Sequence, residues 1–498
     1  MPDSSETDFT LSSLESVTQG ASLYIIGRVA KQLIDFVTSL VLTRSLGTSL
    51  YGVYAYLSVV FTVFRVFTRL GGNTSMLRYL PEYEDDPRMQ NAMLTLAYLT
   101  SLVASVIVAV VVYVSAPLIS SATLDQPIFV EVLRIGAIVI PFNTLAKISY
   151  ATFRAIERME YNILVSSILD PIFRLVFVGG GVVLGYSVIG ATAGLVVAGF
   201  LSLVSALYII YSRTELGSFD FPRKTVMKEY YNYSVPLTFN QIGSFLYNRL
   251  DILMVGFLLS GSAVGIYNIS VMLAGVIAIP LAAFSQIFPP IASKLYHNEE
   301  TSELTDVYRT VTRWIFTVSL FPGIAVMVYA EEILSLFGEG FTDGVLVLIL
   351  FTIAQLTNSA VGPSGFLLMM TDHQYLTMTN QVVSGTLNAV LNYVFILEYG
   401  FIGAAVATAS VLTVINMVRV IQLWYLEGVH PYNRKYIKPI TAGVVAVSAM
   451  YLVSTVLGGY PLLLIGGIAG ATSFGVTLYI IGFEQEEVDI LKRMIESR

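Results

Sequence analysis

The chain has 498 residues, of which 55% are hydrophobic and 12% are charged, whereas a soluble globular protein carries roughly 25% charged residues. So few charged groups cannot cover the surface of a soluble fold, and lipid must therefore form part of the solvent. The net charge of −7 gives no information on partners, because orientation in a membrane follows Lys and Arg in the loops. The absence of cysteine excludes disulfides and thiolate metal sites.

Fourteen stretches along the chain are long and apolar enough to cross a membrane, since a spanning helix needs about 20 mostly apolar residues. Six precede a polar break, six follow it, and two more complete the chain. The predicted fold class is therefore all-α, a polytopic membrane protein with about 14 transmembrane helices. In chain order the stretches are 19–43, 49–71, 91–115, 129–151, 160–184, 188–212, 232–258, 262–288, 306–330, 344–368, 374–397, 400–425, 437–457 and 460–483.

The basic residues of the loops are distributed unequally between the two sides of the membrane. Loops after even-numbered helices, together with the C-terminal tail, contain nearly all of them, while loops after odd-numbered helices contain Arg44 and essentially no other. Because basic loops remain on the inner side, both termini are predicted to be cytoplasmic.

An internal repeat links the two halves of the chain. The sequence Gly-Val-Tyr at 52–54 matches Gly-Ile-Tyr at 265–267, and Ile-Gly-Ala-Thr-Ala at 189–193 matches Ile-Gly-Ala-Ala-Val at 402–406, both at an offset of 213. Six helices per repeat is an even number, so the two repeats are expected to be parallel and related by an axis along the membrane normal.

This repeat divides the chain into two six-helix bundles followed by two additional helices. Such symmetry suits alternating access, in which two similar bundles rock around a central cavity. The predicted parts are a cytoplasmic tail at 1–18, the first bundle at 19–212, a cytoplasmic linker at 213–228, the second bundle at 229–425, two additional transmembrane helices at 426–483 and a cytoplasmic tail at 484–498.

The first helix contains three charged residues, Arg28, Lys31 and Asp35. Their spacing of three and four places them on one helical face, which should point into the bundle because a charge facing lipid is costly. Two interpretations remain open. Arg28 and Lys31 attract a substrate phosphate while Asp35 tunes them, or the three residues form an ion-pair network that only positions the helix.

Two further pairs of charges lie within predicted helices. Asp170 and Arg174 are four residues apart and can neutralise each other, which favours a structural role over ion coupling. Arg249 and Asp251 are two residues apart and point in different directions, so Arg249 is a second candidate for binding a substrate phosphate, and Asp251 is a candidate for ion coupling or structure.

Other polar residues have simpler explanations. Arginines and lysines toward the cytoplasmic ends of helices can extend to the interface: Arg65, Arg69, Lys147, Arg309, Arg313 and Arg419. Four asparagines are expected to hydrogen-bond between helices, with sugar contacts as the alternative: Asn358, Asn380, Asn388 and Asn392.

The segment 20–55 resembles the opening of polysaccharide flippases in the multidrug/oligosaccharidyl-lipid/polysaccharide (MOP) exporter superfamily. Those proteins begin with a charged first helix followed by a Leu-Gly and Tyr-Gly-x-Tyr turn, present here as Leu46-Gly47 and 51–54. The second half echoes this turn at 249–267, and residues 285–295 look similar to the end of the eighth helix in that group.

The resemblance implies that the protein flips a lipid-linked oligosaccharide from the inner to the outer leaflet of the cell membrane, with a cationic cavity for the phosphate headgroup. It implies membrane lipids and glycan-assembly enzymes as further partners, no nucleic acid, no cofactor and no catalytic residues.

Two other functions remain open from the sequence. One is a drug or metabolite exporter of the same superfamily, coupled to sodium or protons through Asp35, Asp170 or Asp251. The other is a membrane glycosyltransferase or polysaccharide polymerase, which usually needs a sizeable outer loop with catalytic groups; most outer loops are too short, and the acidic loop at 331–343 is the candidate. The chain has no P-loop and no dinucleotide fingerprint, and its three histidines have no metal-ligand spacing.

Overall fold

The computed structural model describes the backbone of residues 4–482 and the side chains of residues 27–482 except 66, 237 and 239–249. Within this part the chain forms helices and turns, with no strand, which confirms the all-α fold class. The α-helices are α1 (Ser4–Arg69), α2 (Gly72–Glu82), α3 (Pro87–Ser121), α4 (Pro127–Ala137), α5 (Val139–Ala155), α6 (Met159–Ile163), α7 (Asp170–Phe173), α8 (Ser187–Arg213), α9 (Lys224–Leu258), α10 (Gly261–Gly275), α11 (Ile279–His297), α12 (Thr301–Val328), α13 (Ala330–Ser335), α14 (Val345–Val361), α15 (Ser364–Met370), α16 (Gln374–Glu427), α17 (Ile437–Ser454) and α18 (Gly459–Ile481). Short π-helical segments are η1 (Leu164–Leu169), η2 (Arg174–Gly179) and η3 (Val182–Tyr186), and short 3-10 segments are η4 (Val276–Ala278), η5 (Glu339–Gly344) and η6 (Arg434–Tyr436).

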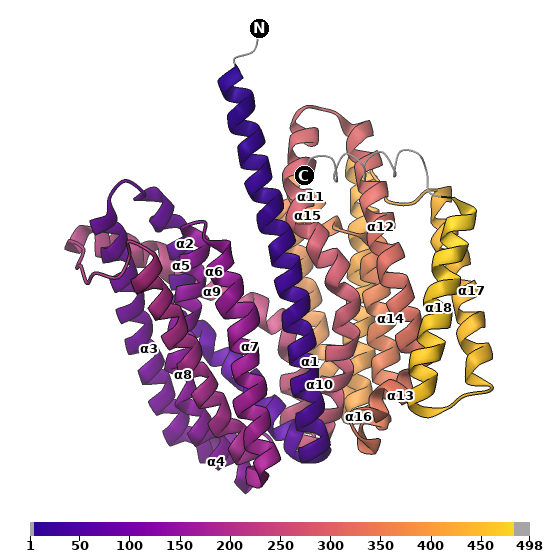
Figure 1. The fold of residues 1–498 in the computed structure, drawn as a ribbon, viewed down its shortest axis with the longest axis horizontal. Helices are drawn as coiled ribbons and strands as arrows, with labels where there is room; N and C mark the ends of the chain where they lie inside the picture. The colour runs from indigo at the N-terminus through magenta and orange to yellow at the C-terminus, as the bar shows by residue number, and fades with distance from the viewer. Residues whose placement is uncertain (1–3, 483–498) are drawn as a thin grey trace. The chain divides into compact units, whose positions relative to one another are not determined.

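The helices form two compact units, with unit 1 ending at Gly265 and unit 2 beginning at Ile266. Helix α9, which lies after the predicted linker, packs against α1 and α2 within unit 1. In unit 2, the last two helices, α17 and α18, lie side by side next to α12 (Figure 1). These two helices are the predicted addition after the second repeat.

Nine helical segments of the described part are long and apolar enough to span a bilayer, and the pair α4 and α5, bent by 44°, makes a tenth. Three of the nine are far too long for one crossing. The α16 helix has 54 residues, which would extend about 81 Å as a straight helix, against a hydrocarbon core of about 30 Å. Each of these three segments must therefore contain a reversal.

Hydrogen bonds show where α16 reverses. The side-chain amide of Asn380 donates to Oε1 of Gln422 at 2.7 Å, and the Gln422 amide donates back to Oδ1 of Asn380 at 3.1 Å. In a straight helix these residues would be about 63 Å apart. The helix reverses at Gly400, whose φ of 60° lies in the left-handed region that only glycine adopts easily.

The other two long segments reverse in the same way. Non-helical glycines divide them at Gly47 (φ 67°) in α1 and at Gly185 (φ 89°) before α8. The three reversals coincide with the predicted breaks between neighbouring stretches, and α9 covers the stretch predicted at 232–258. The predicted count of fourteen is therefore consistent with the structure.

Glycines allow one very close approach of backbones in unit 1. A Cβ atom added to Gly52 in α1 would lie 1.7 Å from the carbonyl oxygen of Gly261, and one added to Gly265 would lie 2.3 Å from the carbonyl oxygen of Thr48. Gly52 and Gly265 are the two glycines related by the 213-residue offset. The predicted repeat therefore places its equivalent glycines in one backbone contact.

The substitution Gly52→Ala is expected to destabilise the protein by about 1–3 kcal/mol or more, because a methyl group at this position overlaps a backbone carbonyl that cannot move aside easily. The matched control is Gly180→Ala, since Gly180 is helical and has nothing within 4 Å of an added Cβ. Thermal unfolding of the detergent-purified variants, followed by the loss of helical circular dichroism, measures both. Equal unfolding midpoints for the two variants would show that the glycine contact does not stabilise unit 1.

Candidate functional site

Of the three charged residues predicted to share a face of α1, Lys31 and Asp35 form an ion pair and Arg28 is a cation in excess. Nζ of Lys31 lies 2.7 Å from Oδ2 of Asp35, and both side chains are about one-third exposed, at 37% and 36%. This contact confirms that the two residues share a helical face. Arg28, one turn earlier, forms no ion pair with the side chains that the structure describes, so this face retains a positive charge.

The second pair lies where the helix after residue 163 is widened. The π-helical segments η1 and η2 flank the single turn α7, which contains Asp170 and Pro171. Proline has no N–H to donate within the helix, and π-helical turns are rare and frequent at functional sites. The sequence thus places Asp170 and Arg174 at a local irregularity of the helix.

Asp170 is almost fully buried and is satisfied by two neighbours. Its Oδ2 lies 3.2 Å from Nη2 of Arg174, and its Oδ1 accepts a hydrogen bond of 2.9 Å from the hydroxyl of Ser202 in α8. The Asp170 side chain is 5% exposed and that of Arg174 is 28% exposed. The geometry agrees with the structural interpretation of this pair.

These two pairs belong to one group of charges. Asp170 interacts electrostatically with Lys31 and Lys147 as well as with Arg174, and Arg174 interacts with Asp35. Lys147 in α5 also interacts with other members of the group. We define the charge cluster as Lys31, Asp35, Arg69, Lys147, Asp170 and Arg174.

The charge cluster contains four cations and two carboxylates, and this imbalance favours an anion. Lys147 is partly stabilised by the ring of Tyr150, whose centroid lies 4.7 Å from its Nζ. Nε of Arg69 is buried and has no hydrogen-bond partner among the described residues. Because buried cations are costly without a counter-charge, the unit is expected to attract a negatively charged group.

A small cavity lies beside the charge cluster, lined by Arg65 and Arg174 together with Ser58 and Asn143. Its volume is about 50 Å³, and a water molecule occupies about 30 Å³ of liquid. The cavity therefore has room for water but is too small for a lipid headgroup. A headgroup would reach the cluster from the α1 side, where the Lys31 and Asp35 side chains are partly exposed.

The structure tests the candidates of α9 only in part. Asp251 is buried, with 5% of its surface exposed. The side chain of Arg249 lies outside the described residues. The assignment of Arg249 to substrate phosphate therefore stays a prediction.

Two members of the charge cluster, Arg69 and Lys147, were explained from the sequence as helix-end residues that extend to the interface. The structure instead brings Lys147 of α5 into electrostatic range of Arg69 and Lys31 in α1 and of Asp170 in α7. The available sequence signal was the spacing of Arg65 and Arg69, which are four residues apart on one helical face. No sequence pattern linked either residue to Asp170.

The asparagines of unit 2 hydrogen-bond between helical segments, which confirms the prediction. The amide of Asn392 donates to the Thr408 hydroxyl at 3.1 Å, and that hydroxyl donates to Oδ1 of Asn388 at 3.2 Å. Oδ1 of Asn358 accepts from the Asn416 amide at 3.1 Å. With the Asn380–Gln422 pair described above, all four predicted asparagines have such partners.

The helical bundle has the fold of a MOP superfamily transporter. The solved structure described as "Lipid II flippase MurJ, inward closed conformation" superposes with a TM-score of 0.70, covering 93% of this chain and 98% of that chain at 16% identity. A likeness at this identity concerns the fold.

Two family models place the chain within the superfamily. The model described as "Polysaccharide biosynthesis protein" matches residues 17–296, and the MatE model matches residues 236–394. The chain belongs to the polysaccharide biosynthesis protein family of membrane proteins, which confirms the resemblance found in the sequence.

Two curated relatives come from Haloferax volcanii. The "Probable low-salt glycan biosynthesis flippase Agl15" is 29% identical over 48% of this chain and 51% of its own length. The "Probable flippase AglR" is 26% identical over 56% of this chain and 59% of its own length. The chain thus spans about half the length of the curated relatives that it matches.

The substitution Asp170→Asn is expected to lower the free energy of unfolding by about 3 kcal/mol, the lower end of the range for breaking a buried pair, because it leaves the partly enclosed cation of Arg174 without its carboxylate. The matched control Asp35→Asn breaks a partly exposed pair, and it should cost about 1 kcal/mol or less. Thermal unfolding in detergent compares the two variants. The double variant Asp170→Asn/Arg174→Gln should recover part of the lost stability, because no unpaired charge remains. If the double variant is less stable than Asp170→Asn, the interpretation that the two residues only neutralise each other is wrong.

Proposed function

We propose that this protein is a flippase that moves a lipid-linked oligosaccharide from the inner to the outer leaflet by alternating access. The observation that carries the proposal is the excess of cations in the charge cluster, inside a membrane bundle of this family. Lipid-linked oligosaccharides have a phosphate or pyrophosphate headgroup, which supplies the missing negative charge. Both curated relatives are named as probable flippases, and the name of one refers to glycan biosynthesis, which supports the proposal.

In the proposed mechanism, Arg28 and Lys31 bind the headgroup first. Both belong to the α1 face that carries an excess positive charge, and Lys31 is partly exposed there. Asp35 holds the Lys31 ammonium in place and limits its attraction for the headgroup, so that release remains possible. Asp170 and Arg174 have a structural role. Their opposite charges cancel within the widened helix, so the pair adds no net charge to the proposed headgroup site.

The proposal includes an orientation and a direction of transport. The basic loops favour cytoplasmic termini, and the headgroup is proposed to be collected on the inner side of the cell membrane and released on the outer side. Glycan-assembly enzymes on the inner side are the partners that supply the substrate. The glycan serves cell-surface polysaccharide or glycoprotein assembly.

The second candidate function is an ion-coupled exporter of drugs or metabolites. Coupling requires a carboxylate that can exchange a proton or sodium ion. Asp170 is held by Arg174 and Ser202, and Asp35 is held by Lys31, so neither is well suited. Asp251 is the remaining buried carboxylate among the three, but the cationic cluster disfavours cationic drugs.

An enzymatic function has little support in the loop at 331–343. Its apolar residues Leu334, Phe337 and Phe341 are fully buried, so the loop folds back onto unit 2. In the described part of the chain, no three acidic or histidine side chains are placed to hold a metal ion. We propose that the protein acts as a transporter without catalytic residues.

The substitutions Arg28→Gln and Lys31→Gln are expected to reduce transport about tenfold or more, because each removes a charge-assisted hydrogen bond to the headgroup. Expression and thermal stability should be nearly unchanged, since the Lys31–Asp35 pair is partly exposed. The measurement is complementation of a gene deletion in the host, with surface glycan and lipid-linked glycans quantified by mass spectrometry. Arg88→Gln is the control, because the Arg88 side chain is 87% exposed.

The deletion itself separates the candidate functions. A flippase predicts that a completed lipid-linked oligosaccharide accumulates while the surface glycan disappears. An unchanged glycan pool in a host without a second flippase would contradict the proposal and favour the exporter. Normal complementation by both stable variants would instead reject the headgroup site on α1.

A further inference from the structure

A broken helix in unit 2 borders a second pocket. No residue of the charge cluster lines this pocket. Helix α14 ends at Val361 and α15 begins at Ser364. Between them, Gly362 has a φ of 60°, and Pro363 follows without a backbone N–H. The break therefore interrupts the backbone hydrogen bonds of a membrane helix.

Two tyrosine hydroxyls satisfy carbonyls that the break leaves free. The hydroxyl of Tyr308 donates to the carbonyl of Val361 at 2.8 Å, and the hydroxyl of Tyr436 donates to the carbonyl of Ala360 at 3.4 Å. Such fixed, broken helices line substrate sites in other membrane transporters. The break is thus held in place by the surrounding helices.

The pocket beside the break has a volume of about 260 Å³ and is partly open. This is below the range of about 300–1,000 Å³ that is typical of sites for drug-sized ligands, so the pocket suits one sugar ring rather than an oligosaccharide. Its polar lining comes from neutral amides and hydroxyls and one cation, and Phe366 adds an aromatic ring. The polar residues are Ser285, Asn358, Ser364, Thr377, Gln381 and Arg419.

Arg419 is only partly engaged by the protein. Its Nη1 donates to Oδ1 of Asn416 at 3.3 Å, and the Asn416 amide in turn donates to Asn358 at 3.1 Å. Nε of Arg419 is buried and has no hydrogen-bond partner among the described residues. A neutral amide leaves the charge of the guanidinium uncompensated.

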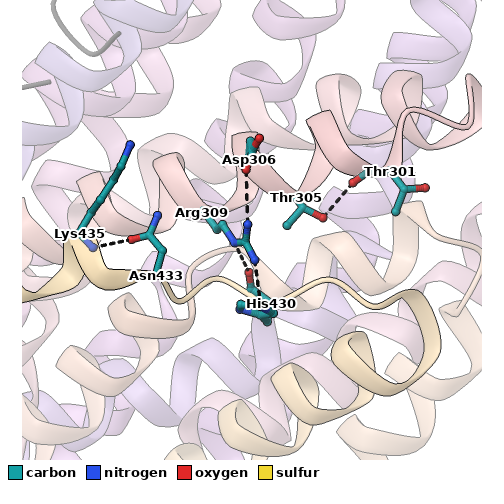
Figure 2. A network of polar contacts seen from close by, with 7 residues as sticks. All are labelled: Thr301, Thr305, Asp306, Arg309, His430, Asn433 and Lys435. Atoms are coloured by element: carbon teal, nitrogen blue, oxygen red, sulfur yellow. Dashed lines mark hydrogen bonds and ion pairs between the residues drawn. The ribbon is translucent and has the colours of Figure 1, made fainter. Parts of the chain in front are cut away.

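Arg309, also in unit 2, differs from Arg419 because its whole guanidinium group is bound by the protein. Figure 2 shows its guanidinium between Asp306 and His430. Nε donates to the His430 carbonyl at 3.3 Å, Nη2 lies 2.9 Å from Nε2 of the His430 ring, and Nη1 lies 3.5 Å from Oδ1 of Asp306. Each of its nitrogens has a protein partner, whereas Arg419 faces a pocket.

Unit 1 has a smaller cavity, of about 50 Å³, that is also lined by an arginine. It lies at the bend between α4 and α5. There the cation of Arg174 is neutralised by Asp170. The pocket in unit 2 is larger, and no carboxylate lines it.

We propose that the pocket at the α14–α15 break binds a single sugar ring bearing one negative charge, a carboxylate or a sulfate. Arg419 supplies a planar donor that suits such a group. Asn358 and Gln381 are amides that can bind ring hydroxyls, and Phe366 can contact the apolar face of the ring. A single cation among neutral groups matches a monoanion better than a pyrophosphate.

The choice of ligand rests on the proposed function, since an acidic sugar would be a unit of the transported oligosaccharide. The test uses the purified full-length protein and free ligands, so it does not depend on transport. Saturation-transfer NMR and titration compare four probes: glucuronate, glucose 6-sulfate, glucose and inorganic sulfate. We expect one of the two acidic sugars to bind more tightly than both glucose and inorganic sulfate.

The variants locate the binding in this pocket. Arg419→Gln should weaken acidic-sugar binding by about tenfold or more, as expected for a lost charge-assisted hydrogen bond. Arg309→Gln is the matched control and should leave affinity unchanged. Gln381→Leu changes an exposed pocket residue, should weaken binding severalfold, and decides the question if Arg419→Gln proves unstable in thermal unfolding.

Three results would overturn the inference: no sugar binds, inorganic sulfate binds as well as the acidic sugars, or Gln381→Leu and a stable Arg419→Gln bind as the unchanged protein does. If no acidic sugar binds while transport still depends on Arg28, this inference fails and the flippase proposal stands. If acidic sugars bind but deletion leaves the glycan pool unchanged, the flippase proposal fails and the pocket assignment stands.

Discussion

A positive charge held inside an apolar helical bundle is costly unless an opposite charge lies next to it. In unit 1 some of the cations have a carboxylate partner and others do not. Asp170 compensates Arg174 inside the bundle, and Asp35 compensates Lys31 where the side chains are partly exposed. The remaining cations have no carboxylate of their own in the charge cluster. An anionic ligand would remove this imbalance, and the headgroup site proposed for unit 1 rests on that excess of positive charge.

The backbone obeys a related constraint. In lipid, every N–H and C=O must find a partner within the protein, so chain reversals and breaks occur only where special residues allow them. Glycines with positive φ, such as Gly47, Gly185 and Gly400, provide the reversals. At Gly362 the break occurs next to a pocket, and tyrosine hydroxyls satisfy the freed carbonyls. At the irregular segments, backbone and side-chain polar groups can therefore become available to bind a ligand inside a helical bundle.

The two units differ in the kind of chemistry that they offer. Unit 1 gathers lysines and arginines around two carboxylates. Unit 2 instead contains amide and hydroxyl networks, in which Arg419 is bound by a neutral asparagine. A lipid-linked oligosaccharide has the same two parts, a charged headgroup and a polar glycan. The proposed headgroup site in unit 1 and the proposed sugar site in unit 2 correspond to these two parts.

The sequence by itself determined the membrane class, the helical segments and the positions of the reversals, because hydrophobic length and glycine conformation are local properties. It also determined which charges share one helix face, as the Lys31–Asp35 pair shows. Only the tertiary structure decided that Lys147 interacts with both Asp170 and Arg69, and that Arg419 faces a pocket whereas Arg309 is fully bonded. These contacts link helices that are distant in the chain. Their geometry depends on how whole helices pack, and helical periodicity does not specify that packing.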